Sequence, residues 1–439
     1  MAKLFGTDGV RGKVGEWPIV PEFALKLGQA VGTYLAAENR KVAICKDTRI
    51  SGDMLEATIV AGLNSVGVDV LLLGVLPTPA MVSLTESLGV DAAIIITASH
   101  NPYTDNGIKL LNAKGTRLSH AETDEIERLI EKDDFIFDSN RMGKVVHDNT
   151  AISKYVAKAK SVIQGDLKGL RVVLDCANGV LSNIMPEIYK DLGAGVIVIG
   201  DNPDGYNINK DCGSTHTELL SETVVKSNAQ LGISVDGDGD RIIICDEKGH
   251  NLDGDQIIAY LAEVFKVKKV VSTVLSNFGL EKHFVEKGVS YSQSAVGELY
   301  VIDEMRKVGA VVGGEESGHM VLLDYAKSGD SLIVGLVIAQ AVLKSGKKMS
   351  EIFPVFQPVA KKRIDVKFAS LEMMDKAVAD PKVLEVIKAC EAALAGSGRV
   401  LVRKSGTEPK VQIWVWGEDQ AIVEKLNAKI VAEVEKFTD

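Results

Sequence analysis

The chain has 439 residues, 46% of them hydrophobic and 25% charged, with a formal net charge of −10. This composition excludes a disordered or collagen-like chain, and the negative charge argues against nucleic acid or an anionic membrane as a partner. No uncharged apolar run reaches the roughly 18 residues of a membrane span, and the N-terminus lacks the apolar core of a signal peptide. Five scattered cysteines form no CxxC pair, which is typical of reduced thiols and favours a cytoplasmic location.

Three segments, starting at Lys41, Arg171 and Lys269, share one pattern. Each opens with a β-branched strand, passes through a turn rich in Ser, Asn, Asp or Gly, and continues into an amphipathic helix that a glycine ends. Strand–helix–strand units of about 30 residues favour parallel pairing, because a parallel connection needs a crossover helix. We therefore expect three related α/β domains with mixed, mostly parallel sheets.

The region after Phe356 has a different pattern. Strands are expected at 363–366, 399–403 and 411–416, and helices at 381–395 and 419–437, which indicates a small α+β domain with an antiparallel sheet. Because small-molecule sites tend to lie between domains, we expect a central cleft. The predicted domain limits are 1–152, 153–253, 254–358 and 359–439.

The stretch "AAIIITASHNPYTDNGIK" begins with a buried strand over 93–96. Ser99 and His100 follow at its carboxyl end, where open α/β sheets bind ligands, and Lys109 comes a little later. The alternative is a turn that satisfies only its own backbone.

In "ISVDGDGDRIIICDEKG", Asp236, Asp238 and Asp240 alternate with glycine. A calcium EF-hand needs glycine at its sixth position and helices on both sides, whereas Arg241 stands there between two expected strands. Three carboxylates can instead hold one Mg²⁺ and leave positions open for a phosphate oxygen, beside which Arg241 would fit. The alternative, an acidic turn, leaves three carboxylates unneutralised.

Two later loops carry polar groups that suit a phosphorylated sugar. In "GGEESGH", Glu315 and Ser317 offer partners for sugar hydroxyls, and His319 is a candidate for proton transfer, although a single histidine is more often structural. The turn in "VRKSGTEP" combines cations, hydroxyls and exposed backbone N–H groups, which favours anion binding over an ordinary hairpin. Its candidate residues are Arg403, Ser405, Gly406 and Thr407. Together with Ser99 and the aspartates, these loops predict phosphoryl transfer on a phosphorylated sugar.

The four stretches together resemble the α-D-phosphohexomutase superfamily. "TASHNP" is similar to its phosphoserine loop, "DGDGDR" to its metal loop, "GEESGH" to its sugar loop and "RKSGTEP" to its phosphate loop, in the family's order and across the whole chain. "FGTDGVRG", "DTRISG", "NPDGYNINKDCGSTH" and "DGDQI" resemble the bacterial branch that acts on glucosamine phosphates.

The resemblance implies a mechanism. Ser99 would carry a phosphate, pass it to glucosamine 6-phosphate and take the other phosphate back from a bound 1,6-bisphosphate, leaving glucosamine 1-phosphate for UDP-N-acetylglucosamine synthesis. It also implies Mg²⁺, one per chain, held by Ser99 with the three aspartates, a hexose bisphosphate as activator, and a homodimer. Glu315 and Ser317 would hold the sugar hydroxyls, and the loop from Arg403 would hold the distal phosphate. The residues lining the active site would be Arg11, His100, Lys109, Arg241 and His319.

Three positions depart from the family pattern. Leu299 and Gln412 stand where arginine is expected, and Glu316 stands where Asn or Gln is usual. The branch acting on glucose and mannose phosphates, phosphomannomutase/phosphoglucomutase, is therefore an alternative. A non-catalytic sugar-phosphate-binding protein is a second alternative, disfavoured because binding alone would not require Ser99 and all three aspartates.

Overall fold

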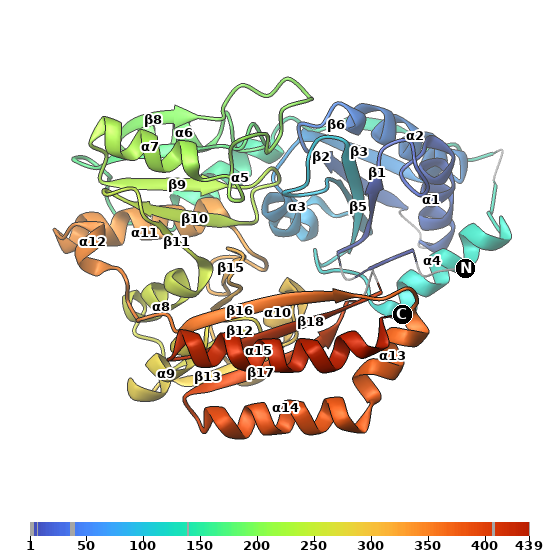
Figure 1. Ribbon diagram of the computed structural model, residues 1–439. Helices are drawn as coiled ribbons and strands as arrows, with labels where there is room; N and C mark the ends of the chain where they lie inside the picture. The colour runs from blue at the N-terminus through green and yellow to red at the C-terminus, as the bar shows by residue number, and fades with distance from the viewer. Residues whose placement is uncertain (1–3, 7, 36–39, 138–139, 406–408, 439) are drawn as a thin grey trace.

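The computed structural model describes residues 4–6, 8–35, 40–137, 140–405 and 409–438. Four sheets follow one another along the chain, each made from one continuous stretch of sequence (Figure 1). Among the described helices, none is long and apolar enough to cross a membrane.

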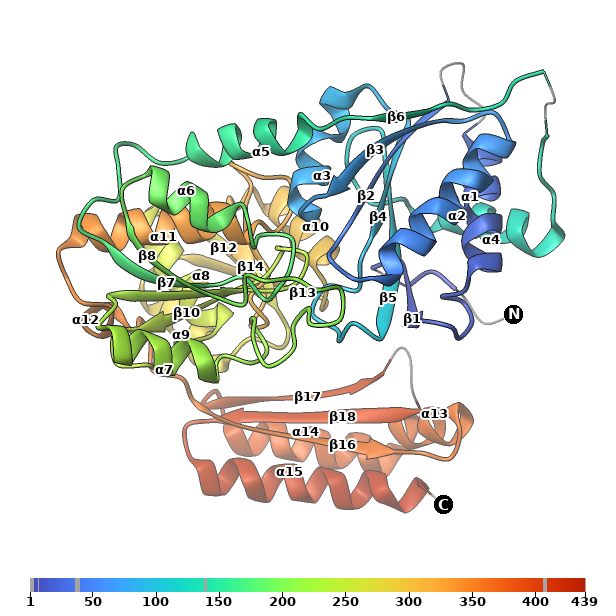
Figure 2. The same ribbon diagram turned by 90° about the horizontal axis from the view of Figure 1, so that it is seen from above.

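The first sheet has six strands in the order β1-β5-β4-β2-β3-β6. Helices α1, α2 and α4 pack together on one side of it and α3 lies on the other (Figure 2). The strands are β1 (Val10–Lys13), β2 (Lys41–Lys46), β3 (Asp69–Val75), β4 (Ala92–Ile96), β5 (Asp105–Asn112) and β6 (Val145–His147). The helices are α1 (Pro21–Tyr34), α2 (Ser51–Ser65), α3 (Thr78–Leu84), η1 (Thr85–Leu88) and α4 (His120–Lys132).

The second and third sheets have the orders β11-β10-β9-β7-β8 and β13-β12-β14-β15. Elements of the second domain are α5 (Ala151–Lys160), β7 (Arg171–Asp175), α6 (Met185–Asp191), β8 (Gly195–Ile199), α7 (Glu218–Ser227), β9 (Leu231–Val235), β10 (Ile242–Asp246) and β11 (Asn251–Leu252). Elements of the third are α8 (Gly254–Val264), β12 (Lys269–Thr273), α9 (Phe278–Glu286), β13 (Ser290–Ser294), α10 (Glu298–Val308), β14 (Val312–Gly314), β15 (Met320–Leu322), α11 (Ser331–Ser345) and α12 (Met349–Ile352).

The same four-strand arrangement occurs in all three domains. It is β3-β2-β4-β5 in the first, β8-β7-β9-β10 in the second and β13-β12-β14-β15 in the third. In each, three strands are parallel and the fourth is antiparallel. The prediction of three related α/β domains with mixed, mostly parallel sheets is confirmed. The domain limits stay predictions, and the first one, at 152, falls inside α5.

The fourth domain is the expected α+β unit, with an antiparallel sheet in the order β16-β18-β17. One helix, α13, was not predicted. It has nine residues and is capped by the preceding Ser370, whose side chain accepts a hydrogen bond from the Met373 N–H. The elements are β16 (Ala360–Lys367), α13 (Leu371–Ala379), α14 (Pro381–Leu394), β17 (Gly398–Lys404), β18 (Lys410–Gly417), α15 (Gln420–Val434) and η2 (Glu435–Phe437).

The two faces of this last sheet differ because side chains alternate along a strand. Val411, Ile413 and Val415 of β18 are buried in a core with α14 and α15. Trp414 and Trp416 belong to the opposite face, where their rings stack 5.6 Å apart. The fourth domain therefore has a core of its own and turns a helix-free face of mixed polarity toward the other three domains (Figure 2).

The first domain also has a core of its own, but one continuous apolar core extends through the first three domains. A buried polar contact lies within it, where the Tyr155 hydroxyl of α5 donates to Asp330 Oδ1 at 2.9 Å. The same oxygen caps α11 by accepting from the Ile333 N–H at 3.0 Å. Burial raises the pKa of Asp330 to about 6, although both hydrogen bonds oppose the shift.

This shift predicts a pH-dependent stability. The folded chain holds the Asp330 proton up to about pH 6, whereas an unfolded aspartate releases it near pH 4, so this contribution to stability is lost as the pH rises between those values. Asp330→Asn keeps an acceptor oxygen and does not titrate. Between pH 4.5 and 7 it should therefore gain on the order of 2–3 kcal/mol of unfolding free energy relative to wild type. Urea unfolding across this pH range measures the difference. The exposed Asp324→Asn is the control, and a pH-independent difference for Asp330→Asn would contradict the prediction.

Candidate active site

Three of the predicted loops occupy the same place in the repeated unit. Each connects the third parallel strand to the antiparallel fourth strand: β4 to β5 with Ser99, β9 to β10 with the three aspartates, and β14 to β15 with Glu315 to His319. The fourth loop joins β17 to β18. Three loops far apart in sequence therefore leave their sheets in equivalent ways, and the fourth connects two antiparallel strands.

Ser99 is held in an unusual backbone conformation. It follows the fully buried strand β4, has a φ of 52° in the left-handed region, and its N–H donates to Thr97 Oγ1 at 2.9 Å. Its side chain is nearly inaccessible, and Oγ donates to Asp236 Oδ2 at 2.6 Å. Left-handed backbone costs free energy for a non-glycine residue and tends to occur at functional sites. The predicted nucleophile and the predicted metal loop are thus in direct contact, although 137 residues separate them.

The three aspartates lie in the tight turn of the hairpin β9–β10. All are buried, and one carboxylate oxygen of each lies within 4.8 Å of the others. Glycine is required at Gly237, where a Cβ atom would lie 2.8 Å from the Ser99 carbonyl oxygen. The flanking elements are strands and not helices, so the exclusion of an EF-hand is confirmed.

This cluster fits a divalent cation with oxygen ligands. In the described part of the chain, Asp238 Oδ1 and Asp240 Oδ1 are buried without a hydrogen-bond partner. Burial, together with the neighbouring carboxylates, raises the pKa of Asp236 well above its usual value. Both features indicate unmet negative charge, which a hard cation such as Mg²⁺ would neutralise through these oxygens.

Lys109 supplies the nearest positive charge. It lies on β5, fully buried, with Nζ 2.9 Å from Asp238 Oδ2 and 3.6 Å from Asp240 Oδ2. Burial opposes its charge, but the carboxylates around it, Asp238 first, outweigh burial and raise its pKa. Lys109 in turn holds the pKa of Asp238 below its usual value, against the effect of burial. The cation predicted to line the site therefore contacts the metal loop.

Arg11 and His100, both from the first domain, lie beside this centre. Arg11, on β1, pairs with Asp8 and extends toward the Ala98 carbonyl oxygen. His100 Nδ1 lies 3.5 Å from Ser99 Oγ. Burial lowers the pKa of His100 to about 3, and the cations Arg241 and Arg11 act in the same direction, so this imidazole is neutral near pH 7.

Arg241 and His319 come from different domains and meet through their backbones. They form a β-bridge, and the next residue, Ile242, donates its N–H to the Gly318 carbonyl oxygen. His319 Nδ1 lies 3.7 Å from Asp240 Oδ1. The metal loop and the sugar loop are therefore fixed against each other.

A cleft of about 1030 Å³ opens above this centre and takes lining residues from all four domains. Ser99, Arg11, Lys109 and the aspartates do not line it. Gly406 and Thr407 lie outside the described residues. The predicted residues that line the cleft are His100, Arg241, Glu315, Ser317, His319, Arg403 and Ser405.

Two of the three departures from the family pattern lie near this cleft, whereas Leu299 lines a different, smaller pocket. Glu316 lines the cleft and pairs with Lys361 of β16, so the sugar loop contacts the fourth domain. Gln412 lies directly opposite Arg403 in the β17–β18 pairing. An arginine at position 412 would place a second cation beside Arg403, and this chain has a neutral amide there.

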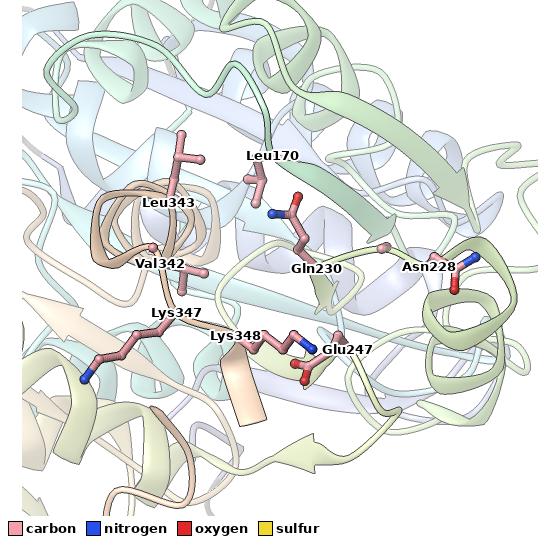
Figure 3. A pocket seen from close by; sticks show the side chains of 10 residues that line it. Leu170, Asn228, Gln230, Glu247, Val342, Leu343, Lys347 and Lys348 are labelled. Carbon is pink, nitrogen blue, oxygen red and sulfur yellow. The ribbon is translucent and has the colours of Figure 1, made fainter. Parts of the chain in front are cut away.

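A second pocket, of about 450 Å³, contains none of the predicted residues. Figure 3 shows Leu343, Val342 and Leu170 on one side of it and Lys348 close to Glu247 on the other. Its lysines and amides belong to surface loops, and the chemistry described above lies elsewhere.

Sequence reasoning assigned no role to Arg49 and Asn209. Arg49 is 2% exposed, and its guanidinium donates to the carbonyl oxygens of Ser99 (3.0 Å), Asn101 (2.8 Å), Asp105 (3.1 Å) and Pro102. Asn209, in the second domain, donates to the Ser99 carbonyl oxygen at 2.8 Å. These side chains position the Ser99 loop. The only signal was that "DTRISG" and "NPDGYNINKD" resemble family stretches, which says nothing about contacts.

The chain matches four domain families of known proteins. They are the phosphoglucomutase/phosphomannomutase α/β/α domains I (residues 2–137), II (152–249) and III (253–359), and the C-terminal domain (364–433). Proteins named phosphoglucosamine mutase are similar over the full length. One from Paramagnetospirillum magneticum is 42% identical, with 99% of each chain covered, and one from Carboxydothermus hydrogenoformans is 43% identical, with 100% of each covered.

Solved structures agree on the fold. A phosphoglucomutase/phosphomannomutase family protein from Burkholderia thailandensis has a TM-score of 0.82 at 22% identity, covering 99% of this chain and 97% of its own. An N-acetylphosphoglucosamine mutase from Aspergillus fumigatus, solved with GlcNAc-6P and magnesium, has a TM-score of 0.66 at 16% identity, covering 99% and 96%. The chain belongs to the phosphoglucomutase/phosphomannomutase family, a group of α-D-phosphohexomutases. This confirms the superfamily that the four loops predicted.

The Arg49 contacts generate a prediction about the Ser99 loop. A lysine at 49 keeps the charge but cannot donate to four carbonyl groups at once. In Arg49→Lys the amides of residues 98–106 should exchange with solvent about tenfold faster or more, since each lost bond to a charged donor is worth over 1 kcal/mol. Hydrogen-exchange mass spectrometry measures this. Arg128→Lys, in an exposed pair with Glu125, is the control. Unchanged exchange, or an equal rise along the whole chain, would contradict a local role.

Proposed function

We propose that the chain is a phosphoglucosamine mutase, which interconverts glucosamine 6-phosphate and glucosamine 1-phosphate through a phosphoserine at Ser99. The observation that carries the proposal is one cleft, lined by all four domains, above a serine in contact with three buried aspartates. Full-length relatives at 42–43% identity bear this name. The product would feed UDP-N-acetylglucosamine synthesis.

The proposed reaction consists of two phosphoryl transfers. In the first, the O1 hydroxyl of glucosamine 6-phosphate attacks the phosphorus on Ser99. The bond from Ser99 Oγ to phosphorus breaks, a bond from O1 to phosphorus forms, and the hydroxyl proton passes to a neighbouring base, for which His100 and His319 are the candidates. The proton then passes from that base to Ser99 Oγ, and the bound 1,6-bisphosphate turns over. In the second transfer Ser99 Oγ attacks the 6-phosphate, the bond from O6 to phosphorus breaks, a bond from Oγ to phosphorus forms, and the Ser99 proton passes through the base to O6, leaving glucosamine 1-phosphate.

Charge compensation in this reaction would come from several groups. Asp236, Asp238 and Asp240 would hold Mg²⁺, which when bound neutralises charge on the transferred phosphoryl group. Lys109, Arg11 and Arg241 would stabilise the phosphoryl oxygens. The conclusion that these carboxylates suit a divalent cation rests on their two unpartnered oxygens and on the raised pKa of Asp236.

The rest of the cleft would hold the substrate. Glu315 accepts the Gly297 N–H at 2.7 Å through Oε1, so its carboxylate has a fixed place in the cleft wall from which to accept sugar hydroxyl protons. Ser317 would bind a neighbouring hydroxyl. Arg403 and Ser405, with Gly406 and Thr407, would bind the distal phosphate. This is the 1-phosphate or the 6-phosphate, depending on which one faces away from Ser99.

Glucose or mannose phosphate is the second candidate substrate. Glu316 and Gln412 differ from the family pattern, and the first lines the cleft while the second lies opposite Arg403. Both positions would therefore affect which substrate is selected. The bisphosphate activator, the homodimer and the cytoplasmic location stay predictions.

The function is tested by comparing kcat/KM for glucosamine, glucose and mannose 6-phosphates, each with its 1,6-bisphosphate. We expect glucosamine 6-phosphate to be preferred, and Ser99→Ala to lose turnover by about 10³-fold or more while keeping wild-type thermal stability. Ser83→Ala, a part-buried hydroxyl of α3 outside the site, is the control. Wild-type-like turnover in Ser99→Ala would contradict the phosphoserine mechanism. No turnover of any hexose phosphate by the wild-type protein would favour the non-catalytic alternative.

Metal dependence is a separate prediction. Asp238→Asn removes a ligand charge and leaves Lys109 facing a neutral amide. It should weaken Mg²⁺ binding by about tenfold or more and lower Mg²⁺-dependent kcat in parallel. Calorimetric titration with MgCl₂ gives the affinity, and the exposed Asp201→Asn is the matched control. Equal affinity in Asp238→Asn and wild type would contradict the three-aspartate site.

A further inference from the structure

One guanidinium group joins the fourth domain to the third. Arg399 is the second residue of β17, and its side chain, 19% exposed, reaches the loop that follows β12. Nη2 donates to the carbonyl oxygens of Val274 (3.1 Å) and Ser276 (2.6 Å), and Nη1 lies 3.4 Å from the Glu281 carboxylate. Because a guanidinium presents its donors in a fixed plane, three acceptors define the orientation of β17 as well as its position.

The loop that Arg399 binds is itself fixed. The Asn277 N–H donates to the buried Asp255 Oδ2 at 2.7 Å. The Asn277 amide also exchanges two hydrogen bonds of 3.0 Å with the backbone of Val359, in the segment that leads into the fourth domain. Val274 and Leu275 of the same loop line the cleft. Arg399 therefore binds to a fixed part of the cleft wall.

The same strand carries the proposed phosphate-binding residues. Arg399, Leu401 and Arg403 alternate along β17 and so share one face, the face toward the cleft. The Arg399 guanidinium stacks 4.7 Å above the Trp416 ring. This contact lies at the end of β17 that is farther from Arg403. Arg403 lies four residues further on, about 13 Å along the strand, so a tilt of about 10° at Arg399 would move it by about 2 Å.

We propose that Arg399 is a positioning residue that sets the distance between the proposed phosphate-binding residues Arg403 and Ser405 and the rest of the cleft. It fixes β17 against the Val274–Ser276 carbonyls, so that Arg403 and Ser405 meet the phosphate that is not being transferred. This inference rests on the proposed function. It assigns Arg399 no contact with substrate, only an effect through Arg403.

A general role in attaching the domain is the alternative, and the chain offers a matched control for it. Lys282 of α9 pairs with Glu418, just after β18, and so also joins the third and fourth domains. Both side chains are largely exposed, and Glu418 follows the end of β18 that pairs with Gly398, away from Arg403. Loss of this pair removes a contact between the domains and leaves the hydrogen bonds from Arg399 to Val274 and Ser276 in place.

The experiment is a double-mutant cycle on the full chain. Wild type, Arg399→Met, Arg403→Met, the double variant and Lys282→Met are compared in KM and kcat for glucosamine 6-phosphate and in melting temperature. We expect Arg399→Met to raise KM about tenfold or more with kcat within about threefold, because the distal phosphate is bound equally in ground and transition states. The double variant should match Arg403→Met alone, since one residue acts through the other. Arg399→Lys should raise KM less than Arg399→Met does, because a lysine keeps the charge. Lys282→Met should leave KM at the wild-type value.

Three outcomes separate the interpretations. If the increases in KM caused by Arg399→Met and Arg403→Met multiply in the double variant, the two residues act independently and the inference is overturned. A lower melting temperature with unchanged KM in Arg399→Met would also overturn it and leave the proposed function standing. If wild type neither turns over glucosamine 6-phosphate nor binds it by titration calorimetry, the proposed function fails, and the inference fails with it.

Discussion

The active centre depends on burying three carboxylates within one turn. Asp236, Asp238 and Asp240 are excluded from water, and buried unpaired charge is among the most costly features a fold can contain. Lys109, a buried cation, compensates part of this negative charge by pairing with Asp238. The Ser99 hydroxyl donates a hydrogen bond to Asp236. The site is therefore suited to bind positive charge, which Mg²⁺ would supply under the proposed function.

The repeated domain unit explains why this centre can form from distant segments. In each of the first three domains the functional loop joins the third parallel strand to the antiparallel fourth, so each loop leaves its sheet at an equivalent edge. The shared core of these domains holds three such edges together, whereas the fourth domain has its own core and contacts the third through polar groups such as Arg399 and Lys361. Geometry within the proposed catalytic centre is thus more strongly fixed than the position of β17, which carries the proposed phosphate-binding residues.

The sequence predicted the parts of the site that are contiguous. "DGDGD" and "TASHNP" each concentrate reactive groups within a few residues, and strand periodicity placed them at strand ends. Arg49 and Asn209 were missed because their partners, the carbonyl groups of the Ser99 loop, lie 50 and 110 residues away and carry no side-chain signal. Helix α13 was missed because nine residues give too little periodicity.

The sequence by itself determined the local chemistry: the strands, the glycine-spaced turn that brings three aspartates together, and the threefold pattern of α/β units. Hydrophobic periodicity and turn residues act over a few neighbouring positions, so these local features can be predicted from the sequence. Only the tertiary structure decided that Ser99 contacts Asp236, that Lys109 is buried against Asp238, and that loops from four domains line one cleft. Those contacts follow from how separate cores pack, which depends on summed burial over the whole chain and is not encoded in any one segment.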